Sequence, residues 1–331
     1  MENAIAMTAR RRAGKIGIAV AFAALATLPT ASARADEGGV SFWLPGQVSS
    51  FAATPMAPGF ALPAIYYHAS VDSGGSKQFI TGGRVVAGLD ADADLVFFAP
   101  TYVFADPVAG GQGALTLAWA AGRMRASVDA TLTGPLGNTL ERNRTDTANG
   151  GSDLYPKGQI TWHGGVHNFG VYAMGDIPTG AYQVGRLANI GINHYALDGG
   201  GMYTYLDATK GHEFSATAGF TYNFENHDTD YRNGVDVHLD WALAQFLSEQ
   251  WLVGLNGYAY QQVSDDSGAG ATLGGFRSRV FGAGPQVGYF FPFGGAKGVV
   301  NLRGNWEWGE QNRPAGWNLY LTVSLPLNGV K

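Results

Sequence analysis

The side chains of this chain that could do chemistry lie in alternating runs rather than in a compact motif. Asp236, His238 and Asp240 occupy every second position of one such run. In an extended strand, residues two apart share a face, so these three ionisable groups point the same way. Such a patch could create a field that sorts solutes, as rings of charged side chains do in pores. It is the strongest single candidate for a functional group in the sequence.

The same period of two puts other polar and aromatic side chains on the polar face of neighbouring runs. They could form a charged constriction, or they could pair with one another as the cross-links of any polar interior. For most of the individual charges the second interpretation is favoured, while the inward aromatic residues would suit an apolar solute. The candidate lining residues are Asp176, Glu213, Asp236, His238, Asp240, Tyr258, Tyr260, Arg303 and Glu307, with Phe246 and Tyr320 on the same face.

Hydrolytic and metal chemistry receive little support. The chain has no Gly-x-Ser-x-Gly elbow, although His238 or His194 could act as the base for a serine on a neighbouring strand. His163 and His167 are four residues apart, but the two glycines between them indicate a turn, and no carboxylate or cysteine accompanies them at ligand spacing. We therefore expect no catalytic residue, no metal site and no cofactor, and we do not expect an enzyme.

Two long runs between 211 and 247 indicate the architecture. Apolar residues take every second position from Phe214 to Phe224, and the pattern returns from Val235 to Leu243. Each run is about twice as long as a typical strand of a soluble protein. A long strand with one apolar and one polar face suits a transmembrane barrel, which has lipid outside and water inside. Since no segment after the N-terminus resembles a spanning helix, a closed barrel is the membrane architecture that the sequence predicts.

The N-terminus predicts export. Basic residues at 10–15 precede an apolar stretch at 16–28 that is too short to span a membrane, and small residues follow it at 31–35. We therefore expect a cleaved signal peptide at 1–35, an N-terminal periplasmic or lumenal segment at 36–58, and a transmembrane β-barrel at 59–331. Cleavage removes more positive than negative charge, so the mature chain is more acidic than the net −5 of the whole sequence. That balance argues against nucleic acid as a partner.

The runs divide the barrel into about fourteen antiparallel strands, each nine residues or longer, as a tilted spanning strand requires. Long and short connections alternate along the chain, which is typical of outer loops and periplasmic turns. An even count puts both termini in the periplasm. Two pairs of runs are separated only by Gly122-Arg123 and by Gly165, and if either pair is a single strand the count becomes twelve. The expected strands are 59–72, 78–89, 94–105, 113–121, 124–133, 156–164, 166–178, 194–207, 212–224, 234–247, 251–263, 276–291, 297–308 and 316–326.

Several stretches resemble the outer-membrane family named for the MetA pathway of phenol degradation. They include Gly175-Asp-Ile-Pro-Thr-Gly180, Leu187-Ala-Asn-Ile-Gly191, Phe220-Thr-Tyr-Asn-Phe-Glu-Asn226 and the N-terminal Leu44-Pro-Gly46. The resemblance covers most of the mature chain. It implies a bacterial outer-membrane channel or transporter that takes up small hydrophobic or aromatic, phenol-like compounds, with outer-membrane lipid and the barrel-assembly machinery as partners. It supplies no defined ligand site.

Three functions are compatible with these patterns. The first is passive passage of such compounds through the barrel, with residues 36–58 folded inside as a gate. The second is a non-transporting structural or surface-binding barrel, whose signature would be a lumen filled by side chains together with longer and richer outer loops. The third, less favoured, is a barrel hydrolase, which requires a nucleophile beside a base. The identity of the solute, the direction of flow and the oligomeric state are left open by the sequence.

Overall fold

A computed structural model describes residues 41–73, 78–81, 84–133, 139–272, 274–275 and 277–327. The predicted signal peptide at 1–35 and the first residues of the predicted N-terminal segment, 36–40, lie outside these ranges. Throughout the described ranges, every regular element is a β-strand. Among the same residues, no helix has the length and apolarity needed to cross a membrane.

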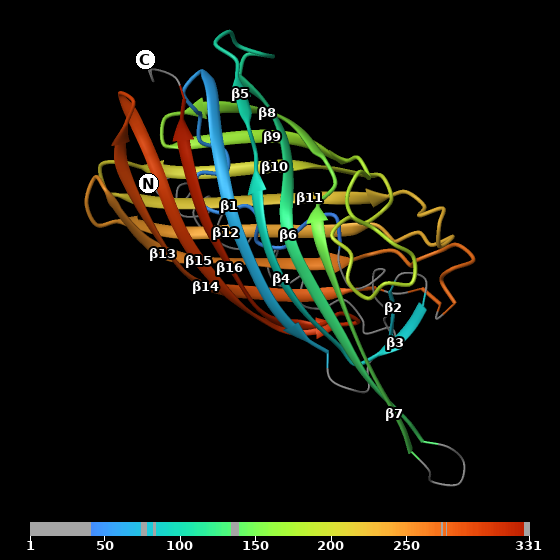
Figure 1. Cartoon of the computed structure of the whole chain (residues 1–331). Helices are drawn as coiled ribbons and strands as arrows, with labels where there is room; N and C mark the ends of the chain where they lie inside the picture. Colours follow the sequence, from blue (N-terminus) through green and yellow to red (C-terminus); the bar gives the residue numbers. More distant parts are fainter. Residues whose placement is uncertain are drawn as a thin grey trace, which may run out of the picture. The chain divides into compact units, whose positions relative to one another are not determined.

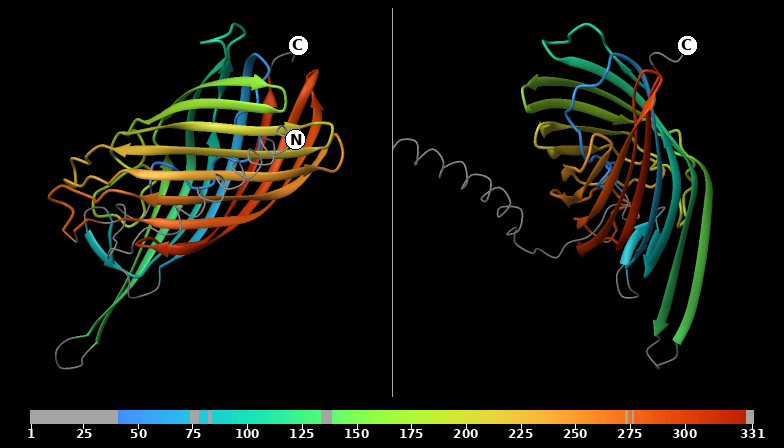
Figure 2. Two further views of the ribbon diagram at one scale, coloured as in Figure 1. Left: turned by 180° about the vertical axis from the view of Figure 1, so that it is seen from behind. Right: turned by 90° about the vertical axis from the view of Figure 1, so that its left-hand side faces the viewer.

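Twelve antiparallel strands close into a barrel (Figures 1 and 2). The first strand pairs with β4 on one side and with the last strand on the other, which closes the ring and leaves no open edge. The ring consists of β1 (Gly59–Asp72), β4 (Leu89–Phe98), β6 (Gln112–Thr133), β8 (Tyr155–Gly164), β9 (His167–Asp176), β10 (Ala196–Asp207), β11 (His212–Asn223), β12 (Asp236–Phe246), β13 (Trp251–Gln262), β14 (Arg279–Phe293), β15 (Ala296–Gln311) and β16 (Ala315–Pro326).

Two further strands attach to this ring. Strand β5 (Thr101–Val103) follows β4 and pairs with the first residues of β1 and with β6. Strand β7 (Thr139–Gly151) forms a long hairpin with the second half of β6, while β8 pairs with the first half of β6. Figure 1 shows this hairpin extending past the neighbouring strands. The prediction of a loop over 134–155 was therefore wrong for 139–151.

The predicted turn at Gly122 and Arg123 was also wrong, because β6 runs through these residues as one strand. Gly122 is needed there for a close approach: a Cβ on it would lie 2.0 Å from the backbone oxygen of Asp94 on β4. Gly165 was interpreted correctly as a turn, since it adopts a φ of +67° between β8 and β9. A glycine in a strand pattern can thus mark either a turn or a close contact between strands.

The spanning strand predicted at 78–89 does not belong to the ring. Strands β2 (Gln78–Thr81) and β3 (Arg84–Ala87) form a separate two-stranded sheet in the long connection between β1 and β4. The two residues between them are both glycine, a dipeptide that favours tight hairpins. Together with the single strand β6, this hairpin reduces the ring from fourteen strands to twelve, which is the alternative count predicted from the sequence.

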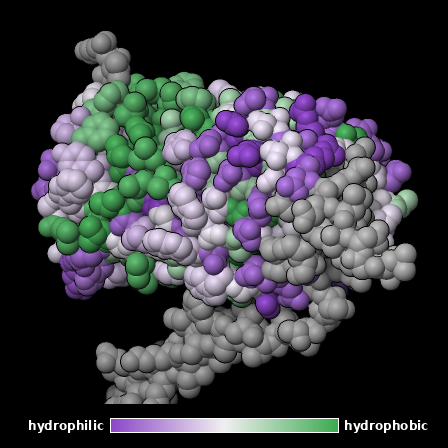
Figure 3. Space-filling view, turned by 60° about the horizontal axis from the view of Figure 1, so that its bottom comes forward, coloured by the Kyte–Doolittle hydropathy of each residue, from purple (hydrophilic) through white to green (hydrophobic). Residues whose placement is uncertain are grey.

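Burial alternates along the ring strands as a period of two requires. On β11, Glu213 and Thr217 are buried whereas Phe220 is 62% exposed, and on β15, Arg303 is buried whereas Trp306 is 64% exposed. Figure 3 shows apolar residues gathered over one part of the exterior and polar residues on the side of the long connections. The outside is therefore apolar where the inside is polar, as in a transmembrane barrel.

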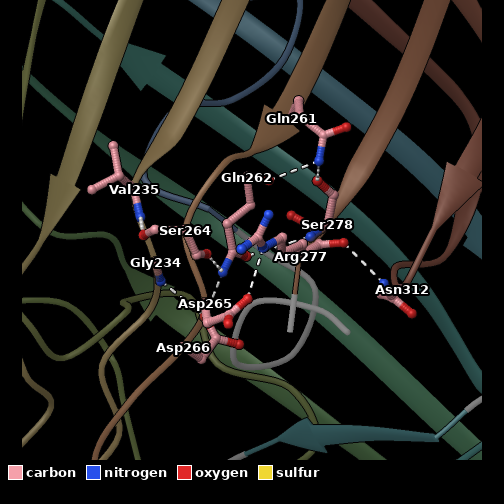
Figure 4. A network of polar contacts seen from close by, with 10 residues as sticks. All are labelled: Gly234, Val235, Gln261, Gln262, Ser264, Asp265, Asp266, Arg277, Ser278 and Asn312. Atoms are coloured by element: carbon pink, nitrogen blue, oxygen red, sulfur yellow. Dashed lines mark hydrogen bonds and ion pairs between the residues drawn. The ribbon is translucent and has the colours of Figure 1, made fainter. Parts of the chain in front are cut away.

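The long connections are held at one end of the barrel by polar contacts (Figure 4). Asp266 accepts hydrogen bonds from the Gly234 backbone N–H at 2.8 Å and from the Gln262 side chain at 2.7 Å. Arg277 pairs with Asp265, with Nε 2.7 Å from a carboxylate oxygen. These contacts join the connection after β11 to the connection after β13.

Candidate functional site

The interior of the barrel is occupied by residues 41–58, which we call the inner segment. Side chains of β6, β10, β11, β12, β14, β15 and β16 donate to it or accept hydrogen bonds from it. Because these strands lie on different sides of the ring, a segment that reaches all of them must cross the interior. The inner segment is therefore the central feature of any pathway through the barrel.

A tight turn at Leu44–Gln47 forms the middle of the inner segment. The Gln47 N–H donates to the Leu44 oxygen at 3.0 Å, and Gly46 takes a φ of +82° after Pro45. This is the arrangement that a Pro-Gly pair favours at the centre of a type II turn. A Cβ on Gly46 would lie 2.7 Å from the Tyr258 ring, so a glycine is required here both by conformation and by space.

Two side chains of opposite charge, Asp240 and Arg303, bind the backbone of this turn. The two carboxylate oxygens of Asp240 each accept one backbone N–H, from Gly46 and from Val48, both at 3.0 Å. The Arg303 guanidinium donates to the oxygens of Gly46 and Gln47 at 3.1 and 2.9 Å. Hydrogen bonds that involve a charged group are stronger than neutral ones, so the two buried side chains bind the turn firmly.

The next part of the inner segment is bound by β10 and β11. Glu213 accepts the Phe51 N–H at 3.0 Å and the Ser50 hydroxyl at 2.8 Å. The Ser215 and Thr204 hydroxyls accept the following two backbone N–H groups, those of Ala52 and Ala53, at 3.3 and 3.0 Å. The strand side chains thus replace the water that would otherwise solvate this backbone.

At the start of the inner segment, Trp43 stacks on His238. Asp198 accepts the His238 Nε2–H at 2.9 Å, the Tyr172 hydroxyl at 2.7 Å and the Thr221 hydroxyl at 2.6 Å. His238 and Asp198 are buried, and so is Trp43 at 1% exposure. The sequence pattern singled out His238 but missed Asp198 and Tyr172, because they lie in glycine-rich strands that lack a charged run.

The structure divides the nine candidate residues into two groups. Those beside the inner segment are Glu213, His238, Asp240, Tyr258 and Arg303. The other four have different surroundings. Glu307 accepts the Tyr258 hydroxyl and the Gly316 N–H, Asp236 accepts an Asn223 amide, and the Arg313 guanidinium lies over the Tyr260 ring. Buried Asp176 has no hydrogen-bond partner among the described residues.

The connection between β9 and β10 also contributes to the barrel core. Its residues Leu187, Ala188 and Ile190 are buried in a cluster that contains Tyr67 of β1 and Tyr320 of β16. Buried Asp153 fixes the base of this loop, because its carboxylate accepts the N–H groups of Gly180 and Ile192, each at 2.7 Å. The glycine-rich motifs at 175–191 therefore shape a loop that packs on the interior, a role that their sequence did not reveal.

The histidines do not form the pairs that hydrolysis would need. His238 bonds to Asp198 and lies near Tyr172, and His194 contacts the backbone oxygen of Tyr195; within the described ranges neither contacts a serine hydroxyl. His163 and His167 contact Asn168 and Tyr203 separately. Clusters of three or more potential metal ligands are not found in the described part of the chain.

A closed antiparallel barrel with an apolar exterior and a polar, peptide-filled interior defines the class of transmembrane β-barrels. The family model for the MetA pathway of phenol degradation matches residues 74–323. The chain belongs to this family.

One solved structure supports the fold. The COG4313 outer membrane channel from Pseudomonas putida F1 superposes with a TM-score of 0.65 at 13% identity, over 84% of this chain and 99% of that chain. A Pseudomonas aeruginosa FadL homologue matches at a TM-score of 0.44 and 10% identity, over 88% of this chain and 95% of that chain. No curated protein sequence matches the chain.

Proposed function

We propose that this protein is an outer-membrane channel for the passive uptake of small hydrophobic or aromatic compounds. Family membership and the barrel fold support the channel class, and the phenol-degradation family suggests the chemical nature of the solute. Outer-membrane lipid surrounds the apolar exterior, the solute enters from the side of the long connections, and the barrel-assembly machinery inserts the exported chain. The proposed mechanism involves no covalent step.

One observation carries the mechanism. Charged and polar side chains of several strands hold the backbone of the inner segment across the interior, with Asp240 and Arg303 at its centre. A segment bound by side chains alone can leave without breaking the strand pairing of the barrel. We infer that the inner segment is a gate and that the described conformation is the closed one.

The gate can be tested with a reversible lock, because the native chain contains no cysteine. The Ala52 nitrogen lies 3.3 Å from the Ser215 hydroxyl oxygen, so the double variant Ala52→Cys, Ser215→Cys places the two cysteines at contacting positions. Planar-bilayer conductance of this refolded variant is measured before and after reduction. Reduction should raise the bilayer conductance of the double variant. It should also raise the uptake of labelled 4-methylphenol by porin-deficient cells that carry this variant. The two single-cysteine variants should not respond to reduction in either assay.

Two results would contradict the proposal. Equal conductance of the disulfide-linked and reduced forms would mean that the inner segment does not gate the pathway. No 4-methylphenol uptake above that of cells without the protein, in the reduced form as well, would mean that the barrel does not transport this class of solute. The second result would favour the structural or surface-binding barrel instead.

A further inference from the structure

A cavity of about 480 Å³ lies between two long connections, outside the interior just described. The connection after β9 contributes His194 and Tyr195, while Tyr222 at the end of β11 and the loop that follows contribute the opposite wall. The volume falls in the range of small-molecule sites. The two connections are joined around it, since the Asn193 amide donates to the side chains of Asn226 and Asp228 at 2.9 and 3.0 Å.

One wall of the cavity is aromatic. Tyr195, Tyr222 and Phe224 are all exposed, and the last two rings meet edge to face with centroids 5.1 Å apart. The Phe224 N–H donates to the Tyr195 oxygen at 3.0 Å, so the three side chains are set by backbone pairing rather than by free loop motion. An aromatic ring inserted here would find both ring faces and ring edges.

The cavity also holds a fixed hydrogen-bond donor. The Arg232 guanidinium lies 4.7 Å from the centre of the Tyr222 ring, and its Nε donates to the Asn223 oxygen at 3.1 Å. The Arg232 backbone is tied to Ser267 by two hydrogen bonds of 2.9 Å. Its terminal Nη groups donate to no described residue. They can therefore donate to a ligand.

His194 supplies an acceptor. Its Nδ1 lies 3.0 Å from the Tyr195 backbone oxygen. Because a carbonyl can only accept, Nδ1 carries the proton, and Nε2 is then the acceptor of the neutral ring. Burial lowers the pKa of His194 below its ordinary value, which keeps the ring neutral near pH 7. Within the described ranges no group donates to Nε2.

The charge of the cavity decides which ligand suits it. Glu225 and Asp228 line it together with Arg232, so carboxylates outnumber the guanidinium. A phosphate or carboxylate group would be repelled, whereas a neutral hydroxyl can donate to His194 Nε2 and accept from Arg232 Nη. The aromatic wall accommodates the remainder of such a molecule.

We propose that this cavity is a binding site for a small, uncharged phenolic compound, with its ring against Tyr222 and Phe224 and its hydroxyl between His194 and Arg232. The site rests on the proposed function, because it would collect the solute beside the mouth of the channel before passage.

Ligand-observed NMR titrations of the refolded full-length protein in micelles test the site, with empty micelles as the blank. 4-Methylphenol and toluene form a matched pair that differs by the hydroxyl. We expect the dissociation constant of 4-methylphenol to be at least roughly tenfold lower than that of toluene, since one well-made hydrogen bond accounts for about that factor. His194→Asn keeps a donor for the Tyr195 oxygen but removes Nε2, so it should abolish the preference. His227→Asn, at an exposed position of the same cavity, should retain it.

Three outcomes would overturn the site: equal affinity of the two ligands for the wild type, an undiminished preference in His194→Asn, or displacement of 4-methylphenol by dodecyl phosphate at lower concentration. The last would identify a lipid-headgroup site instead. If binding fails while the cysteine lock still controls conductance and reduction restores uptake, the channel proposal stands without this site. If the preference is seen but the lock has no effect, the site stands and the gate does not.

Discussion

The rings of Trp43 and His238 lie face to face, with centroids 3.6 Å apart and planes 12° apart. Trp43 belongs to the inner segment and His238 to β12, so the stack joins the inner segment to the barrel wall. His238→Phe keeps a ring for stacking and loses the bond to Asp198, whereas His238→Ala loses both.

We expect His238→Ala to expose the inner segment more than His238→Phe does. Removing a buried ring leaves a cavity and typically costs a few kcal/mol, which corresponds to at least about a tenfold rise in the opening equilibrium. The rate of chymotrypsin cleavage after Phe51, followed by mass spectrometry of the folded protein, measures this opening. Equal rates for the two variants would show that the stack does not hold the segment.

Asp240 gives a second prediction. Its two carboxylate oxygens serve two backbone N–H groups, and Asp240→Asn would place an amide NH₂ against one of them. The loss of one charged hydrogen bond, about 1.5 to 3 kcal/mol, should increase the open fraction in planar bilayers by an order of magnitude or more. Asp265→Asn, in an exposed loop pair with Arg277, is the matched control and should leave the open fraction unchanged.

Strand β10 offers a prediction about assembly. A Cβ on Gly200 would lie 2.1 Å from the Ala218 backbone oxygen, whereas on the adjacent Gly199 the nearest atom would be 3.6 Å away. Gly200→Ala should therefore force β10 and β11 apart and cost about 1 to 3 kcal/mol, while Gly199→Ala should be nearly neutral. Urea midpoints of folding into lipid vesicles compare the two, and an equal shift would contradict the tight register at Gly200.

The membrane position of the barrel is testable on β13. Leu255 and Trp251 are both exposed on the outer face, Leu255 in the middle of the strand and Trp251 at its first residue. Leu255→Arg should cost about 2 to 4 kcal/mol of folding free energy, and Trp251→Arg about 1 or less, because the penalty for a charge falls toward the interface. The same vesicle-folding assay measures both variants. A smaller penalty at 255 than at 251 would mean that the hydrocarbon layer does not lie over the middle of β13.

The sequence alone determined the barrel class and the facing of its strands. A period of two in long runs is a local property, since each residue's side depends only on its position in its own strand. Thus Arg303 and Trp306 could be assigned opposite faces before any pairing was known. The same reasoning failed at Gly122, because whether a glycine turns the chain or admits a neighbouring backbone depends on the strand beside it.

Only the tertiary structure decided what the inward residues do. Asp240 and Arg303 bind the same turn at Gly46, and Asp198 accepts a hydrogen bond from His238. These contacts join residues far apart in the chain, and no local pattern encodes them. The cavity at Tyr222 likewise arises from two loops that meet in space. The face on which a side chain lies follows from the geometry of its own strand. A binding site inside the barrel forms only when several strands close into one ring.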